Sequence, residues 1–362
     1  MRQLSKIRKH ENSSLKNEVF YHHYPCNIYI LGKKTICYQY PLLTPKCLLK
    51  QLEGFGRLTF ANGHQLEGFF RHGVLTGFAR KYDEKKRLTD FGLYENGKAC
   101  YIWWKLIEFG GAVIGHINDE GQLTGPEIVY LYPDFKTGFM GHFEDGVLVE
   151  AQAVQLEAVV EENKLLIPLF SDPAGPYFRR DVSDFVSMTK EPLLADPYET
   201  EWVEVRPSTV PFANEGLFAR RSVESGQILS FYNGIRRELK RSWDKPDWVK
   251  SAYRIFDPTR DEIKDKGSLD IPTDYIDFNN YCASLSHKTN HSFLPSAEFE
   301  IFHHPRFGLV PCLISSTSIQ TGEEIFVHYG YTLEHCPDWF TDAWATDNYP
   351  VPESFKVPRQ EG

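Results

Sequence analysis

Short apolar and aromatic runs alternate with polar, glycine-containing turns through the first half of this chain of 362 residues. Four glycines recur at intervals of 24, 23 and 26 residues, and a second glycine follows each of them five or six residues later. Turns such as Asn96-Gly97 and Asp145-Gly146 between apolar runs are a strong signal for β-hairpins. One hairpin cannot bury its apolar face alone, so we expect neighbouring hairpins to stack into one elongated sheet over residues 52–150. The first glycines are Gly68, Gly92, Gly115 and Gly141, and the second are Gly73, Gly97, Gly121 and Gly146.

The repeat weakens at two places. The third unit departs from the pattern at Gly110-Gly111, where a simpler turn is expected. Residues 1–51 match the repeat poorly. They are interpreted either as a degenerate repeat or as a cap, because terminal repeats are often atypical.

Residues 151–206 are predicted to be an acidic connector, with short apolar strands over 151–160 and 165–170. From Glu144 to Arg206 the chain has 14 acidic and 5 basic residues, which accounts for the whole net charge of −9. This charge argues against a protein that grips nucleic acid through a basic face of its own. Two interpretations stay open: an acidic surface that steers a lysine-rich peptide, or an ordinary solvated face.

Composition limits where the protein can reside and whether disulfides or a metal site are expected. Aromatic residues make up 14% of the chain, which favours sheet over helical bundles. No apolar run approaches the roughly 18 residues that span a bilayer, and the first 20 residues are charged and polar. We therefore expect a protein that is nuclear and/or cytoplasmic, not secreted, and without a transmembrane segment. The seven cysteines form no Cys-x-x-Cys pair, so neither a disulfide framework nor a metal site is expected.

Four short motifs carry the chemical signal of the second half. They are Asn214–Phe218, Ser230–Gly234, Asn290–Phe293 and Gly330 with a tyrosine on each side, and they follow one another within about 120 residues. Each is weak alone, but the ordered set resembles the signature segments of SET-domain protein-lysine methyltransferases. The repeats of the first half resemble MORN repeats. Over roughly residues 52–345 the chain is similar to the MORN–SET group of histone-lysine monomethyltransferases.

This resemblance implies transfer of a methyl group from S-adenosylmethionine to the ε-amine of a lysine in histone tails or non-histone proteins. A free lysine has a pKa of about 10.4, so neutralising it at pH 7 costs on the order of 4–5 kcal/mol. The enzyme therefore needs a narrow apolar channel that disfavours the ammonium, with oxygens around the methyl. Tyrosine suits this, because its ring builds the wall and its hydroxyl gives one polar point. The channel residues implied are Tyr329, Tyr331, Tyr232 and Phe299, with Tyr329 closest to the transfer.

The same resemblance implies a set of residues around the cofactor, S-adenosylmethionine. Gly216 permits a tight approach of the chain, and Glu215 can hold a cationic amino group. The implied cofactor-binding residues are Ala213, Asn214 and Glu215 at the methionine end, Asn290 and His291 at the adenosine, Lys288 in the same pocket, and Trp339 over the adenine.

The chain departs from the family pattern at several positions. Phe293 stands where many SET enzymes have a cysteine, and a segment over 337–347 is expected to close the channel without a zinc site. Ser296 replaces a common asparagine. Phe299 replaces the tyrosine of the monomethyltransferases, whose hydroxyl can hold a water where a second methyl would fit, so it predicts a dimethyl-lysine product. The insert over 236–275 recognises the peptide sequence of the substrate in the family. Its sequence here differs from that of the relative, so the resemblance does not extend to peptide specificity.

The sequence thus predicts a mainly β protein: a MORN hairpin sheet, then a SET-domain β fold with a threaded C-terminal segment and short helices. We expect a monomer that acts on a lysine-containing protein and does not bind nucleic acid directly. The main alternative is a catalytically silent MORN–SET scaffold; a methyl-lysine reader would have no need of the cofactor segments. The predicted divisions are 1–51 (N-terminal segment), 52–150 (repeats), 151–206 (connector), 207–336 (SET domain) and 337–362 (closing segment).

Overall fold

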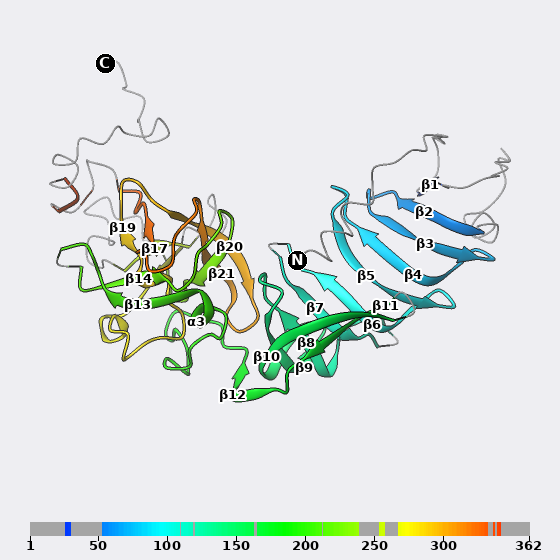
Figure 1. Ribbon diagram of the computed structural model, residues 1–362, viewed down its shortest axis with the longest axis horizontal. Helices are drawn as coiled ribbons and strands as arrows, with labels where there is room; N and C mark the ends of the chain where they lie inside the picture. The colour runs from blue at the N-terminus through cyan, green and yellow to red at the C-terminus, as the bar shows by residue number, and fades with distance from the viewer. Residues whose placement is uncertain are drawn as a thin grey trace, which may run out of the picture. The chain divides into compact units, whose positions relative to one another are not determined.

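The computed structural model divides the chain into two compact units, Met1–Arg180 and Asp181–Gly362 (Figure 1). Most of the predicted N-terminal and closing segments lie outside the described residues, as does much of the insert over 236–275. The structure describes residues 26–29, 53–108, 110–118, 120–162, 165–211, 213–238, 253–257, 267–331, 336 and 339–341.

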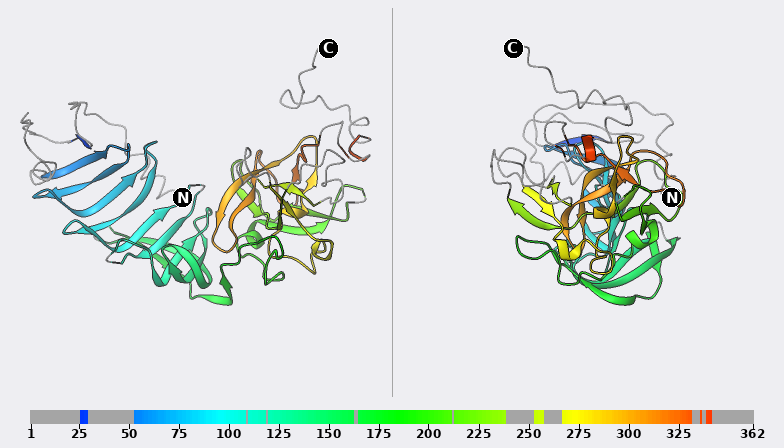
Figure 2. Two further views of the ribbon diagram at one scale, coloured as in Figure 1. Left: turned by 180° about the vertical axis from the view of Figure 1, so that it is seen from behind. Right: turned by 90° about the vertical axis from the view of Figure 1, so that its left-hand side faces the viewer.

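One antiparallel sheet of 12 strands forms the described part of the first unit. Strands β1 to β11 lie side by side in chain order, and β12 pairs with β10 (Figure 2). This confirms the predicted stack of hairpins in a mainly β chain. The strands are β1 (Cys26–Tyr29), β2 (Gly54–Phe60), β3 (Gln65–Arg71), β4 (Val74–Tyr82), β5 (Leu88–Glu95), β6 (Lys98–Leu106), β7 (Ala112–His116), β8 (Gly125–Leu131), β9 (Thr137–Glu144), β10 (Val147–Glu162), β11 (Leu165–Phe170) and β12 (Ala174–Arg179).

The repeating glycines lie where a neighbouring strand leaves no room for a side chain. Gly68 lies opposite Ala79, and Gly92 lies opposite Trp103. A Cβ atom on Gly92 would lie 2.2 Å from Cε3 of the buried Trp103 ring, and one on Gly141 would lie 2.3 Å from a backbone oxygen of the next strand. The period therefore reflects two strands and two turns, with a glycine recurring on every second strand.

The second glycine of each unit belongs to a tight turn. Asn96-Gly97 has φ angles of 51° and 79°, and His72-Gly73 and Asp145-Gly146 share this left-handed conformation. Two successive residues with positive φ are typical of a type I′ turn, whose twist matches that of the flanking strands. Gly110 and Gly111 also have positive φ, 99° and 86°, and space is restricted as well, since a Cβ atom on Gly111 would lie 2.3 Å from the carbonyl oxygen of Leu131.

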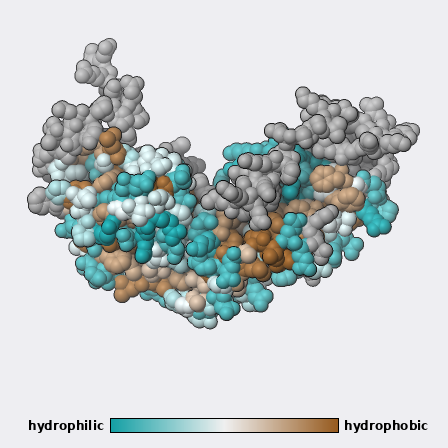
Figure 3. All heavy atoms as spheres, viewed as in Figure 1, coloured by the Kyte–Doolittle hydropathy of each residue, from teal (hydrophilic) through white to brown (hydrophobic). Residues whose placement is uncertain are grey.

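The long strand β10 brings a hairpin onto the sheet. Its first half pairs with β9 and its second half with β11, and the register shifts between Leu156 and Ala158. The indole nitrogen of Trp104 donates a hydrogen bond of 3.0 Å to the carbonyl oxygen of Leu166, which ties this hairpin to β6. Hydrophobic residues gather over the middle strands (Figure 3). The buried cluster is Phe91, Trp104, Ala112, Ile114, Val129, Leu131 and Val154, against which Leu156, Val159, Leu166 and Phe170 pack.

The second unit consists of small sheets and short helices. The sheets are β13–β14, β15–β21–β20, β16–β18–β17 and the parallel pair β19–β22. The elements are α3 (Glu199–Trp202), β13 (Val203–Pro207), β14 (Glu215–Ala219), β15 (Ile228–Phe231), β16 (Ile235–Glu238), β17 (Ile255–Phe256), β18 (Gly267–Asp270), η2 (Thr273–Tyr275), η3 (Ser286–Lys288), β19 (Asn290–His291), β20 (Ala297–His304), β21 (Gly308–Ser315) and β22 (Phe326–Val327), where η is a 3₁₀ helix.

An apolar core supports these sheets. Its buried members are Val203, Leu217, Ala219, Val223, Leu229, Leu285, Ala297, Leu313, Ile319, Ile325 and Val327. In the first unit, β10 and β11 continue the sheet past residue 150, and the division between the two units falls after Arg180. The finer domain boundaries and the threading of the C-terminal segment stay predictions. Among the described residues, no helix has the length and apolarity to cross a membrane.

The register of Gly92 with Trp103 leads to a stability test. Gly92→Ala should lower the free energy of unfolding by about 1–3 kcal/mol, because the added methyl overpacks the indole ring. Denaturant unfolding would measure this loss. In a Trp103→Leu background the same substitution should cost much less, and an equal cost in both backgrounds would contradict the packing explanation.

Candidate functional site

The predicted site residues converge where β19 runs parallel to β22. Asn290 pairs with Phe326, and His291 pairs with Val327. This pairing places the Asn-His motif beside the segment that leads directly to Tyr329. The two motifs lie far apart in the chain, so the parallel register is what joins them.

Asn290 is held by three acceptors. Its Nδ2 donates to the Ser208 hydroxyl at 2.9 Å, to the backbone oxygen of Glu215 at 3.0 Å and to Glu324 Oε1 at 3.0 Å. The buried Glu324 carboxylate also accepts the backbone N–H of Thr209 at 2.7 Å. One amide and one carboxylate therefore join the loop before β14, β19 and the strand region before β22.

Glu324 was missed by the sequence analysis. Burial raises its pKa, but hydrogen bonds from Thr209, Asn290 and Ser208 outweigh burial, and the pKa ends below its ordinary value. A Cβ atom on Gly216 would lie 2.2 Å from Glu324 Oε1. Gly216 thus leaves room for the Glu324 carboxylate. A signal existed in the sequence, since Glu324 directly precedes the apolar run Ile325–Val327.

The loop before β14 carries the predicted methionine-end residues. Asn214 has a φ of 58°, and its carbonyl accepts the backbone N–H of Ser208 at 2.8 Å. Ala213 precedes it, with its N–H bonded to the carbonyl of Val210 at 3.2 Å. This left-handed turn directs the chain into Glu215 at the start of β14.

Glu215 and Lys288 form an ion pair. The Lys288 ammonium donates to Glu215 Oε2 and to the backbone oxygen of Ile276. The Lys288 side chain is 1% exposed, whereas that of Glu215 is 33% exposed. The cationic partner of Glu215 in this structure is Lys288.

His291 presents a buried hydrogen-bond donor. Its Nδ1 accepts the backbone N–H of Tyr329 at 3.1 Å. Burial, and then the nearby His328 ring, lower the pKa of His291 to about 4, so the imidazole is neutral at pH 7. A neutral imidazole that accepts at Nδ1 carries its proton on Nε2. That buried nitrogen has no partner among the described residues, so it fits a ligand that offers an acceptor.

Aromatic rings surround the His291 imidazole. Its ring centroid lies 4.6 Å from that of Phe293, 5.0 Å from Phe340, 5.3 Å from Tyr329 and 5.9 Å from Trp339. Phe340 is buried, whereas Trp339 is 47% exposed and could cover a bound aromatic group. Phe340 was not predicted, since no motif distinguishes it from its neighbour.

The four predicted channel residues form two perpendicular ring pairs. Tyr232 and Phe299 have centroids 5.9 Å apart at 83°, and Tyr329 and Tyr331 have centroids 5.9 Å apart at 88°. Phe299 and Tyr329 pack against the same core cluster. Burial, and then the charge of Asp270, raise the pKa of Tyr232.

The hydroxyl groups of this channel are directed by backbone carbonyls. Tyr329 donates to the carbonyl of Thr289 at 2.9 Å, and Tyr232 donates to that of Tyr253. Burial raises the pKa of Tyr329, Tyr232 and Tyr253, so all three phenols stay protonated at neutral pH. Tyr253 was missed because it lies in the insert, where the family pattern gives no guidance.

Two protein families match separate parts of the chain. The SET domain matches residues 214–330. The family described as histone H3 K4-specific methyltransferase SET7 N-terminal matches residues 94–166. Histone-lysine N-methyltransferase SETD7 of Halocynthia roretzi is 34% identical over 272 residues, which cover 72% of this chain and 68% of that relative.

Solved structures resemble smaller parts of the chain. One is ctPRC2 in an autoinhibited conformation bound to S-adenosylmethionine, with 19% identity, a TM-score of 0.27, and coverage of 42% of this chain and 18% of that chain. Another is KRYPTONITE in complex with mCHH DNA, an H3(1–15) peptide and SAH, with 14% identity, a TM-score of 0.26, and coverage of 41% and 26%.

A SET domain with its tyrosines and Asn-His pair in one place defines a protein-lysine methyltransferase that uses S-adenosylmethionine. The chain belongs to this class. Within it, the matches of both halves and the relative from Halocynthia roretzi place the chain in the SETD7 family of histone-lysine methyltransferases. The predicted family, reaction and cofactor are thereby confirmed.

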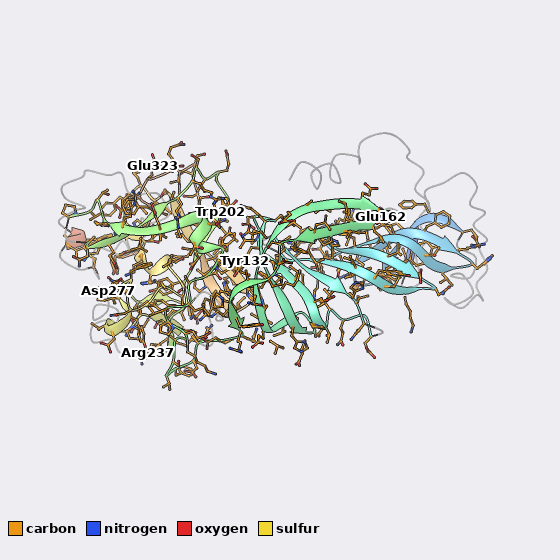
Figure 4. All side chains as sticks on the ribbon, turned by 60° about the horizontal axis from the view of Figure 1, so that its bottom comes forward. Tyr132, Glu162, Trp202, Arg237, Asp277 and Glu323 are labelled. Atoms are coloured by element: carbon orange, nitrogen blue, oxygen red, sulfur yellow. The ribbon has the colours of Figure 1, made fainter. Side chains whose placement is uncertain are left out.

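The Glu324 network leads to a test of cofactor binding. Glu324→Gln should weaken S-adenosylmethionine binding about tenfold, because one carboxylate oxygen becomes an NH₂ that faces a donor, either Thr209 N–H or Asn290 Nδ2. Isothermal calorimetry would measure the affinity. Glu323→Gln is the matched control: Glu323 is exposed at the periphery (Figure 4), and it caps the Gln320 N–H at 2.7 Å. Equal affinities of the two variants would contradict the role of the network.

Proposed function

We propose that the site around His291 and Tyr329 transfers a methyl group from S-adenosylmethionine to lysine in histone tails and/or non-histone proteins. The observation that carries this proposal is the bond from the Tyr329 N–H to His291 Nδ1, which joins a candidate adenosine site to the tyrosine channel. The name of the Halocynthia relative, a histone-lysine methyltransferase, supports a histone substrate.

The chemistry of the residues fits the proposed cofactor. S-adenosylmethionine, when bound, supplies a methyl group on a positively charged sulfur. Lys288 and Glu215 would hold the carboxylate and the amino group of its methionine end, because their ion pair offers one charge of each sign. Asn290 and His291 would hold the adenosine, with Trp339 over the adenine. Ala213 and Asn214 would shape the loop at the methionine end.

The proposed channel keeps the reacting amine neutral. The phenols of Tyr232 and Tyr329 are buried and protonated, so they offer no full negative charge that would retain an ammonium. Apolar ring walls add a desolvation penalty for the charged form. We propose that Tyr329 lies closest to the transfer, with Tyr331 and Tyr232 shaping the channel.

Transfer of labelled methyl to a mixture of histones and cell lysate, read by mass spectrometry, tests the assignment. The wild type should label lysine, and His291→Ala should lose cofactor binding in calorimetry. Tyr329→Phe should bind cofactor normally, yet its kcat should fall about tenfold or more, because the hydroxyl that is fixed by the Thr289 carbonyl is gone. Unchanged turnover would remove Tyr329 from its role. Cofactor binding without transfer would indicate that the mixture lacks the substrate, whereas failure of both binding and transfer would favour the scaffold alternative.

Phe299 sets the proposed methylation state. Its ring faces Tyr232 and has no hydroxyl to hold a water at the channel wall. Exhaustive reaction of the wild type should therefore yield dimethyl-lysine, whereas Phe299→Tyr should stop at monomethyl-lysine. Phe299→Leu, which adds no hydroxyl, is the control and should not impose the stop. Monomethyl product alone from the wild type would show that Phe299 does not permit a second transfer.

The proposed enzyme acts as a monomer in the nucleus and/or cytoplasm. Its net charge of −9 supports contact with basic peptides and gives no basic face for nucleic acid. The MORN sheet is proposed as a platform for the catalytic half.

A further inference from the structure

Glu199 is a carboxylic acid in the interior of the second unit. It is the first residue of α3 and is 0% exposed. Asp196 holds this turn in place: its Oδ1 accepts the N–H of Tyr198 at 2.9 Å and that of Glu199 at 3.2 Å. Burying a carboxylic acid costs free energy unless hydrogen bonds within the protein replace those that it made to water.

One oxygen of Glu199 joins two segments of the candidate site. Its Oε1 accepts the backbone N–H of Phe231 at 2.7 Å and that of Leu285 at 3.0 Å. Phe231 directly precedes Tyr232 of the channel. Leu285 directly precedes η3, from which the chain runs through Lys288 to the Asn-His pair.

These two segments are joined by side chains rather than by a strand ladder. Among the described residues, β15 pairs with β21 and not with the segment 281–288. Other bonds across this seam, the boundary between residues 230–233 and 281–288, are Ser230 Oγ to Ser286 Oγ at 2.5 Å, Asn233 N–H to Ser284 Oγ at 3.1 Å and the Tyr281 hydroxyl to the carbonyl of Asn233 at 2.9 Å. Glu199 is the member of the seam that holds a backbone N–H on each side.

We infer that Glu199 is a positioning residue for methyl transfer, one that fixes the channel wall at Tyr232 relative to the cofactor side at Lys288 and Asn290. This inference rests on the proposed function. The cofactor residues have anchors of their own, since Asn290 is held by Glu324 and Lys288 by Glu215. Loss of Glu199 should therefore disturb the alignment of the two reacting partners more than the affinity for either.

Burial, and then the charge of Asp196, raise the pKa of Glu199. A neutral amide is consequently a close substitute, because its carbonyl oxygen can still accept both N–H groups. An alanine leaves both N–H groups buried without that acceptor, and an aspartate is one methylene too short to reach both.

The experiment compares Glu199→Gln, Glu199→Asp and Glu199→Ala in the full chain, with a histone mixture and S-adenosylmethionine. Glu199→Gln should keep kcat within about twofold of the wild type. Glu199→Ala should lose about tenfold or more in kcat, while the KM for substrate and the calorimetric Kd for S-adenosylmethionine change less than about threefold. Glu199→Asp should fall between these two.

A core variant separates positioning from general loss of stability. Val223→Ala truncates a buried residue of the apolar core that bonds neither site segment, so at a similar fall in Tm it should keep its kcat. If Glu199→Ala does not fold, the comparison of Glu199→Gln with Glu199→Asp decides. Equal kcat for Gln and Asp, or a Gln variant as slow as Ala, would overturn the inference. Absence of both transfer and cofactor binding in the wild type itself would instead overturn the proposed function.

Discussion

The candidate site depends on one buried carboxylate, that of Glu324. It binds Ser208, Thr209 and Asn290, which come from two segments more than 80 residues apart in the chain. Removing a single acceptor from such a network leaves buried donors without partners, which costs more than any one of its hydrogen bonds contributes. Gly216 is part of the same constraint, because only a residue without a side chain leaves room for the carboxylate.

His291 shows how this scaffold creates chemistry. The parallel pairing of β19 with β22 directs its Nδ1 to a backbone N–H, and burial keeps the ring neutral. Together these place the ring proton on Nε2, and aromatic rings surround the imidazole. The tyrosines follow the same logic, since backbone carbonyls direct their hydroxyls and burial keeps them protonated. Hydrogen bonds to the backbone thus orient the His291 ring and the hydroxyls of Tyr329 and Tyr232.

Local signals in the sequence predicted much of this structure. The turn at Asn96-Gly97 and the glycines of the repeat depend on neighbours within one hairpin, so their spacing sufficed to predict the sheet. The motifs at His291 and Tyr329 were found because their residue types and order are distinctive. Glu324 and Glu199 were not found, since their partners are far away in sequence: Glu199 and Leu285 are separated by 86 positions. Phe340 and Tyr253 were missed because neither belongs to a motif of the family or to a long periodic segment.

The hairpin of β10 and β11 has a consequence for how the sheet evolves. A ladder in which each strand contacts only its neighbours can gain or lose a whole hairpin without disturbing the rest. Here Trp104 on β6 bonds to Leu166 on β11, which joins strands five places apart in the order of the sheet. An insertion or deletion between them would shift both ends of that contact. The protein should therefore tolerate the gain or loss of a hairpin before β6 in the chain, but not between β6 and β11.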